Sequence, residues 1–388
     1  MYKINNHIHT PYSFSAFKSI EEAFELAKGE GIQVLGINDF FVTDGYREFN
    51  EQAQKYRIYP LFNVEFIGLL KDEQSKGIRV NDPSNPGRTY FCGKALQYPV
   101  ALSKVNREKL AKVVAESQGQ VKEMLEKLSA HLIRIDSPFT LSFEDIKRKY
   151  ARELVRERHI AQGLRYTINE HFADTGSRLK FLEKLYSGHK STADLSENSS
   201  LEGELRNRLL KAGGEAFVPE DESSFLPVPE LAEIIIDAGG IPCYPVLLDD
   251  KNGNYTEFEG DKEALLNRLK QLNVGAVELI PGRNNLGHLN TFVEFFHENN
   301  FLVSFGTEHN TPEMIPLEVK ASGETPLDDF LLQVNEETSC VYIAHQERIR
   351  KGQEGYLNSD GQCKTAQNKD FVREGKSILT NFLENKMV

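Results

Sequence analysis

Histidines and acidic residues occur in the sequence where they could bind a metal ion. His7 and His9 alternate in the segment NHIHT. Because side chains of an extended chain alternate with period two, both imidazoles point to the same side and can bind one ion. Glu65 and Glu308 follow other expected strands, and two imidazoles with carboxylates favour Zn, Mn or Fe over the oxygen-binding Ca and Mg. We therefore predict a site for a divalent transition metal.

The elements that must position these residues are buried strands that alternate with amphipathic helices. Continuous apolar runs predict strands at 32–37, 58–66, 241–247, 274–280 and 301–305, and helical periodicity predicts helices at 19–31, 46–56, 229–240 and 289–300. Short links between them indicate parallel βα units. In a parallel α/β barrel, functional groups lie at the C-terminal ends of the strands, so the candidate residues are expected at one end of the barrel.

A long middle region interrupts this alternation. Residues 98–224 carry helix patterns without signals of buried strands, which predicts a helical insertion between residues 1–97, the first part of the barrel, and residues 225–388, the rest of the barrel with a C-terminal extension. Within the insertion, residues 187–204 are polar and poor in large apolar side chains, which predicts an exposed loop. The segment after Pro312 shows mixed patterns that predict no particular element.

Composition narrows the possible partners. The chain has 46 Lys and Arg against 58 Asp and Glu, a formal charge of -12, and the acidic balance argues against nucleic acid and anionic membranes. No apolar run approaches the ~20 residues that span a bilayer, and the N-terminus lacks a signal core. The four cysteines form no CxxC pair. We expect a cytoplasmic protein that binds a small-molecule substrate or ligand.

Several motifs in this order resemble those of the PHP (polymerase and histidinol phosphatase) family, in particular its stand-alone phosphoesterases with a helical insertion. The segments that carry the resemblance are NHIHTPYSFSA at 6–16, GINDFFVTDGY at 36–46, NVEF at 63–66, YFCGKAL at 90–96, RERHIAQGL at 156–164, AGGIPCYPV at 238–246 and FGTEHN at 305–310. The resemblance implies a distorted (β/α)7 barrel of the PHP type, with metal at the C-terminal ends of the strands.

The resemblance also implies up to three metals, and this chain keeps their ligands unequally. One ligand set is complete as His7, His9, Glu65 and Glu308. The positions of the other two sets hold residues that bind cations poorly or not at all, namely Tyr90, Tyr244, Phe14, Phe40 and Asn310. We therefore predict one divalent transition metal, Zn, Mn or Fe, where relatives hold two or three.

Further residues are candidates for chemistry and substrate binding. Asp39 and His309 are candidate general bases. Substrate contacts are predicted for His159, Arg156 and Arg158, which the resemblance places at the active site, and for Tyr90, Tyr244, Arg283 and Asn310.

Three functions remain open at this point. The first is a mononuclear metal-dependent hydrolase acting on an ester, amide or lactone. The second is a catalytically inactive relative that binds a small ligand or another protein, and the third is a metal-dependent phosphoesterase that rebuilds a second ion site. A DNA polymerase accessory role finds no support, because the chain is acidic and has no polymerase segment.

Overall fold

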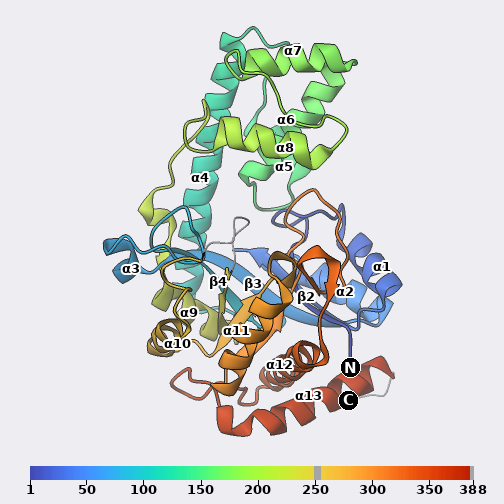
Figure 1. Cartoon of the computed structure of the whole chain (residues 1–388), viewed down its shortest axis with the longest axis vertical. Helices are drawn as coiled ribbons and strands as arrows, with labels where there is room; N and C mark the ends of the chain where they lie inside the picture. Colours follow the sequence, from blue (N-terminus) through green and yellow to red (C-terminus); the bar gives the residue numbers. More distant parts are fainter. Residues whose placement is uncertain (249–254, 385–388) are drawn as a thin grey trace.

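The computed structural model describes residues 1–248 and 255–384, which form a nearly closed barrel with a helical region above it and two long helices below it (Figure 1). The strands of the barrel follow the order β1-β2-β3-β4-β6-β7-β8. Their bounds are β1 Ile4–Ile8, β2 Val34–Phe40, β3 Tyr59–Leu69, β4 Arg88–Lys94, β6 Ile241–Pro245, β7 Ala276–Leu279 and β8 Leu302–Phe305. The short β5, Leu226–Pro227, pairs with β3.

The two ends of the sheet meet beside His7 and His9. The backbone N–H of His9 donates to the carbonyl of Glu308 at 2.7 Å, and that of Thr307 donates to the carbonyl of His7 at 3.1 Å. Five predicted strands are confirmed as β2, β3, β6, β7 and β8. One strand breaks the parallel pattern, since β4 runs antiparallel to both β3 and β6. The predicted seven-stranded barrel is therefore confirmed, with one reversed strand.

Helices cover the outer face of the barrel, as the amphipathic patterns predicted. They are α1 Ile20–Glu30, α2 Tyr46–Tyr56, α9 Val228–Asp237, α10 Lys262–Gln271 and α11 Leu286–Glu298, with the short α3 Lys71–Ser75 beside them. The start of α1 is fixed by Ser19, whose hydroxyl accepts the backbone N–H of Glu22. These helices bury Phe24, Phe49 and Phe296 against the strands.

The C-terminal residues close the end of the barrel opposite the strand C-termini. Helices α12 Asp329–Arg350 and α13 Asn368–Leu383 lie side by side there (Figure 1). Tyr342 and Phe371 from these helices share an apolar cluster with Ile4, Val34 and Tyr59 from the beginnings of the strands. The C-terminal helices thus cover the end of the barrel at which the strands begin. A ligand must therefore enter at the opposite end, where the strands have their C-termini.

The helical region above the barrel has a hydrophobic core of its own. It contains α4 Lys104–Arg134, α5 Phe143–Tyr150, α6 Glu157–His171, α7 Thr175–Leu185, α8 Asn198–Leu205 and a π-helical turn at Arg206–Leu210. The prediction of a loop over 187–204 is wrong for residues 198–204, because α8 begins at Asn198. Leu201 and Leu205 are buried four residues apart, and Glu202 pairs with Arg165 at 2.6 Å. None of the described helices is both long and apolar enough to span a bilayer.

Candidate metal centre

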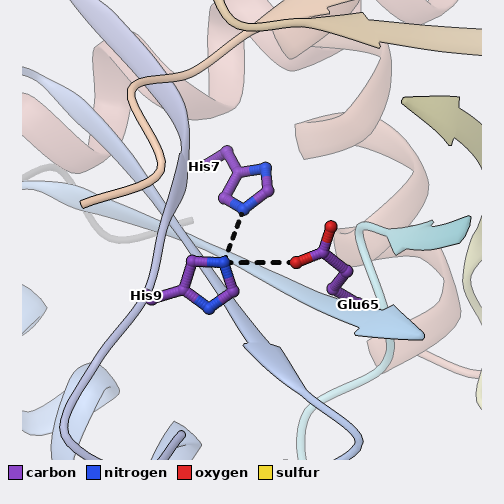
Figure 2. Close-up of side chains that lie close together, drawn as sticks. All are labelled: His7, His9 and Glu65. Carbon is purple, nitrogen blue, oxygen red and sulfur yellow. Dashed lines mark hydrogen bonds and ion pairs between the residues drawn. The ribbon is translucent and has the colours of Figure 1, made fainter. Parts of the chain in front are cut away.

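Two histidines from the end of β1 and a glutamate from β3 converge in the barrel (Figure 2). His7 Nε2 lies 3.2 Å from His9 Nε2, which in turn lies 3.2 Å from Glu65 Oε2. The register of β2 with β3 sets Glu65 beside Phe40 at the same end of the barrel. All three side chains are buried, with 1%, 0% and 4% of their surface exposed. Their ligand atoms lie within 4.8 Å of one another, close enough to hold one metal ion.

The donor atoms suit a divalent transition metal. Burial lowers the pKa of His9 to about 4, so its imidazole is neutral and offers a lone pair. Burial also raises the pKa of Glu65 to about 8, because no cation compensates the carboxylate sufficiently. A divalent ion at this point would stabilise the ionised Glu65 and accept both imidazole nitrogens. The residues present therefore fit a metal site of the mixed nitrogen and oxygen type.

A glutamate that the sequence analysis missed sets the orientation of His7. Glu278, on β7, has an oxygen 2.8 Å from His7 Nδ1, so that Nδ1–H donates and Nε2 carries the lone pair toward the centre. A carboxylate behind a histidine ligand in this way fixes its tautomer and raises its basicity. The side chain of Glu278 is 1% exposed, which makes its charge dependent on a partner inside the protein.

That partner is Lys94 on β4, a second residue that the sequence analysis missed. Its Nζ lies 2.5 Å from Glu278 Oε1 and 3.3 Å from Asn38 Oδ1, and its side chain is fully buried. Burial by itself would raise the pKa of Glu278, but Lys94 and His7 lower it to about 2. The sequence contains one signal for this pair, namely a charged residue within each of the apolar segments YFCGK and GAVEL. A charge buried in such a strand requires a buried partner.

Asp39 lies behind His9 and does not line the cavity. Its carboxylate accepts hydrogen bonds from the Thr10 backbone at 2.7 Å and hydroxyl at 2.5 Å, and from Ser13 Oγ at 2.6 Å. Ser13 Oγ also lies 3.2 Å from His9 Nδ1 and can accept a hydrogen bond from its Nδ1–H. These contacts occupy both carboxylate oxygens of Asp39. This geometry favours a role in positioning His9 and the loop after β1, and the role of general base for Asp39 stays a prediction.

Glu308 lies at the cavity but outside the three-residue group. Its carboxylate forms an ion pair with Arg283 and accepts the side-chain N–H of Asn310 at 3.0 Å. Arg283 lowers the pKa of Glu308 against the effect of burial, which by itself would raise it. The backbone of Glu308 is left-handed, with φ of 63°, where β8 ends and the barrel closes on β1. The structure thus brings Glu308, Arg283 and Asn310 together, with Arg283 already paired.

Three other predicted residues, His309, Tyr244 and His159, do not line the cavity described below, and their polar atoms contact other groups. His309 contacts Thr307 Oγ1 and the carbonyl of Ile315 through its two ring nitrogens, both at 2.8 Å. The hydroxyl of Tyr244 donates to Glu259 at 3.1 Å and accepts the backbone N–H of Asn81. His159 Nδ1 accepts the backbone N–H of Arg156 at 2.9 Å and so caps α6. These contacts support structural roles for His309, Tyr244 and His159.

A cavity of about 990 Å³ joins the metal centre to the insertion. Its lining includes His7, Glu65 and Tyr90 on the barrel side. The positively charged side chains that line it are Arg88, Arg156, Arg158, Arg206, Lys211 and Arg283. The cavity is large enough for a small-molecule substrate, and carboxylates, among them Glu157, Glu220 and Glu222, line it beside these cations.

A glycine at the end of β8 allows the strand that carries His7 to approach closely. A Cβ atom at Gly306 would lie 2.2 Å from His7 Cβ and 2.8 Å from His7 N. We expect Gly306→Ala to displace β1, to lower the metal content and to destabilise the fold by about 1–3 kcal/mol. Metal analysis and urea unfolding would measure both effects. Gly282→Ala is a matched control, because its new Cβ would be 3.8 Å from the nearest atom; equal effects of both changes would contradict the prediction.

Comparison with known proteins agrees with this barrel. Residues 5–161 match the PHP domain family model, which confirms the resemblance drawn from the motifs. No curated protein matches the chain. A "putative metal-dependent phosphoesterase" from Bifidobacterium adolescentis has a similar structure at 15% identity and a TM-score of 0.57, covering 85% of this chain and 94% of that one.

A second solved structure shares the fold. It is an amidohydrolase from Chromobacterium violaceum with bound sulfate and no metal, similar at 14% identity and a TM-score of 0.52 over 86% of this chain and 96% of that one. At these identities the two structures establish the fold of the chain. The chemistry must be argued from its own residues.

Proposed function

We propose that this protein is a metal-dependent hydrolase with a mononuclear centre formed by His7, His9 and Glu65. The observation that carries the proposal is the convergence of these three buried ligand atoms on a cavity large enough for a substrate. A bound divalent ion would supply Lewis-acid polarisation of the substrate and would acidify water at neutral pH. The substituted positions Phe14, Phe40, Tyr90 and Tyr244 are consistent with a single ion, because they offer cations poor ligands or none.

The remaining cavity residues would bind and orient the substrate. Tyr90 lines the cavity, and burial raises its pKa to about 12, so its neutral hydroxyl can donate a hydrogen bond. Glu308 is our proposed fourth ligand, and binding there would require its carboxylate to exchange Arg283 for the metal. Arg283 would then be released to meet an anionic group of the substrate, with Asn310 beside it.

Phosphoester hydrolysis is the second candidate, and one observation favours it. The cavity wall is rich in arginine, and a guanidinium binds phosphate oxygens in a bidentate manner. A single metal lacks the joint clamp that two ions place on attacking and leaving oxygens. Ester, amide and lactone substrates therefore come first in a screen, and phosphoesters second.

Elemental analysis of untagged protein, purified without added metal, tests the metal centre. We expect about one equivalent of Zn, Mn or Fe in the unchanged protein. The double variant with His7→Ala and His9→Ala should lose this metal, while circular dichroism shows that it is still folded. Two or three equivalents would overturn the single-ion proposal.

Hydrolysis of a panel of p-nitrophenyl esters, anilides, lactones and p-nitrophenyl phosphates tests the activity. We expect turnover of at least one class, loss of that turnover after chelation, and its return when the metal is restored. Turnover that survives chelation would contradict the proposed centre. Bound metal without turnover of any class would favour the inactive ligand-binding relative.

A further inference from the structure

The chain bends sharply after β8, at the residue that we propose as the fourth metal ligand. The backbone of Glu308 and that of His309 are both left-handed, with φ of 63° and 54°. The N–H of His309 donates to the carbonyl of Thr307 at 2.9 Å, which closes a three-residue turn centred on Glu308. A turn of this size with positive φ at its centre is rare and strained, so the surrounding structure must hold it.

The direction of the Glu308 side chain depends on this turn. The side chain borders both the large cavity and a second cavity of about 280 Å³, and its ion pair with Arg283 would be exchanged for a bound metal. Its backbone is fixed to β1 on both sides, because its N–H donates to the carbonyl of His7 at 2.9 Å and its carbonyl accepts the N–H of His9 at 2.7 Å. The turn therefore sets how the carboxylate faces the two histidines.

The buried side chain of His309 holds the turn in place. Its Nε2–H donates to the carbonyl of Ile315 at 2.8 Å, so in the neutral ring Nδ1 accepts from the hydroxyl of Thr307, also at 2.8 Å. The ring stacks on Phe17, with ring centres 4.8 Å apart. The carbonyl of His309 accepts the N–H of Ala16 at 2.9 Å. These contacts join the turn to the loop after β1 and to the segment that follows the turn.

The same hydrogen bonds continue to the strand that carries the histidine ligands. Thr307 Oγ1 accepts from Asn5 Nδ2 at 2.7 Å, and Asn5 Oδ1 accepts the backbone N–H of His7 at 3.1 Å. The second N–H of the Asn5 amide donates to the carbonyl of Leu317 at 2.9 Å. One tautomer of His309 thus satisfies every donor and acceptor in a chain that ends at the backbone of His7.

We propose that His309 is a positioning residue of the metal centre, which holds the strained turn so that Glu308 presents its carboxylate to the ion bound by His7, His9 and Glu65. Both ring nitrogens of His309 are engaged, so its effect is exerted through Glu308 and not on the substrate. This inference rests on the proposed metal centre with Glu308 as its fourth ligand. The hold on the turn itself needs no metal.

Zn affinity and the geometry of the centre test the proposal. We expect His309→Ala to bind Zn about 10–100-fold more weakly, as changes behind metal ligands typically do, and to alter the d–d spectrum of the Co(II) form. Competition with a coloured chelator would measure the affinity. His309→Asn should restore part of it, because asparagine tolerates the left-handed backbone and its amide can replace one hydrogen bond. Glu308→Gln is the benchmark, and adding His309→Ala to it should cause little further loss.

His345 provides a matched control for the loss of a buried histidine. Its ring nitrogens also contact backbone groups, the carbonyl of Gly239 at 2.7 Å and the N–H of Tyr356 at 2.8 Å, and it lies on α12 at the opposite end of the barrel. We expect His345→Ala to lower the stability in urea as His309→Ala does, but to leave the Zn affinity and the Co(II) spectrum unchanged. Equal losses of Zn affinity in the two variants would indicate general destabilisation and would overturn the proposal.

Hydrogen exchange of the metal-free protein separates the hold on the turn from the metal centre. The amides of His9 and Glu308 should exchange faster in His309→Ala than in the unchanged protein, and not in His345→Ala. Zn affinity that Glu308→Gln lowers and His309→Ala does not would reject the positioning role and keep the centre. Zn affinity that Glu308→Gln leaves unchanged would reject Glu308 as a ligand, and this inference with it.

Failure of the proposed function gives a different result. If the unchanged protein binds no Zn, the centre is rejected, and exchange alone then decides whether His309 holds the turn at Glu308. Faster exchange confined to His309→Ala would retain that hold. Equal exchange in the unchanged protein and in both alanine variants would overturn it as well.

Discussion

Replacing Lys94 with methionine is expected to lower the free energy of unfolding by about 3–5 kcal/mol, because removal of one member of a buried ion pair leaves the other charge uncompensated. The side chains of Lys94 and Glu278 are 0% and 1% exposed, and Lys94 Nζ lies 2.5 Å from Glu278 Oε1. Methionine fills a similar volume without charge, so the loss would report electrostatics more than packing. Urea unfolding of the metal-free protein at neutral pH would measure it.

Two further variants make this result interpretable. Adding Glu278→Gln to Lys94→Met removes both charges and should recover part of the lost stability. Lys55→Met, which breaks the exposed pair with Glu21, should leave the stability nearly unchanged, since water screens such pairs. A small loss for Lys94→Met, similar to that of Lys55→Met, would contradict the buried-pair argument.

The same change should weaken metal binding. Without Lys94, the carboxyl of Glu278 favours its protonated form and accepts less strongly from His7 Nδ1–H, so His7 becomes a weaker ligand. Changes behind a metal-binding histidine typically cost about 10–100-fold in metal affinity. Competition with a coloured chelator would measure this affinity, and the d–d spectrum of the Co(II) form would show whether the ligand field has changed. Unaltered affinity and spectrum would indicate that Lys94 serves stability alone.

Much of the barrel could be predicted because its strands are covered on both faces. Such strands require continuous apolar runs, and five of these runs were found where the structure has β2, β3, β6, β7 and β8. The antiparallel direction of β4 could not be predicted, because direction depends on pairing between distant segments. Helix α8 was missed since its polar residues concealed the buried pair Leu201 and Leu205.

The site was predictable only as far as spacing within one segment could specify it. His7 and His9 were found because one extended segment fixes both side chains, and Glu65 because it lies near the end of the predicted strand 58–66, which is part of β3. Lys94 and Glu278 were missed because each is explained only by the other, on a strand far away in the sequence. The hydrogen bonds that hold Asp39 and His309 could not be predicted, because they depend on how the loops after β1 and β8 fold.

Buried titratable groups give the metal-free protein a predicted stability optimum near pH 6.5. Burial raises the pKa of Glu65 and of Glu259 to about 8 each. A carboxyl whose pKa is raised on folding contributes stability that is fully present below its unfolded pKa near 4.5 and is lost as the pH rises to 8. The alkaline side of the optimum should therefore fall by a few kcal/mol.

Buried histidines produce the acidic side of this optimum. Burial lowers the pKa of His9, His309 and His345 to about 4 and that of His159 to about 3. The unfolded chain takes up protons at these residues as the pH falls below 6.5, whereas the folded chain does so only near pH 4 or lower. Protonation of the unfolded histidines should therefore lower the stability with decreasing pH across that window, against the opposing effect of the carboxyls whose pKa is raised by burial.

Bound metal should reduce the part of the alkaline loss of stability that comes from Glu65. A metal ligand must be ionised, so the ion stabilises Glu65 as the carboxylate. Glu259 lies outside the ligand group and hydrogen-bonds to Tyr244 and Thr256, so its contribution should persist in the metal-bound protein. Urea unfolding between pH 5 and 9, with chelator or with Zn, would separate the contributions of Glu65 and Glu259. Without metal, Glu65→Gln should reduce the alkaline loss of stability as Zn does. In the Zn-bound protein, Glu259→Gln should remove the loss of stability that remains. An alkaline slope that is the same with and without Zn would show that Glu65 does not bind the ion, and the centre formed with His7 and His9 would have to be rejected.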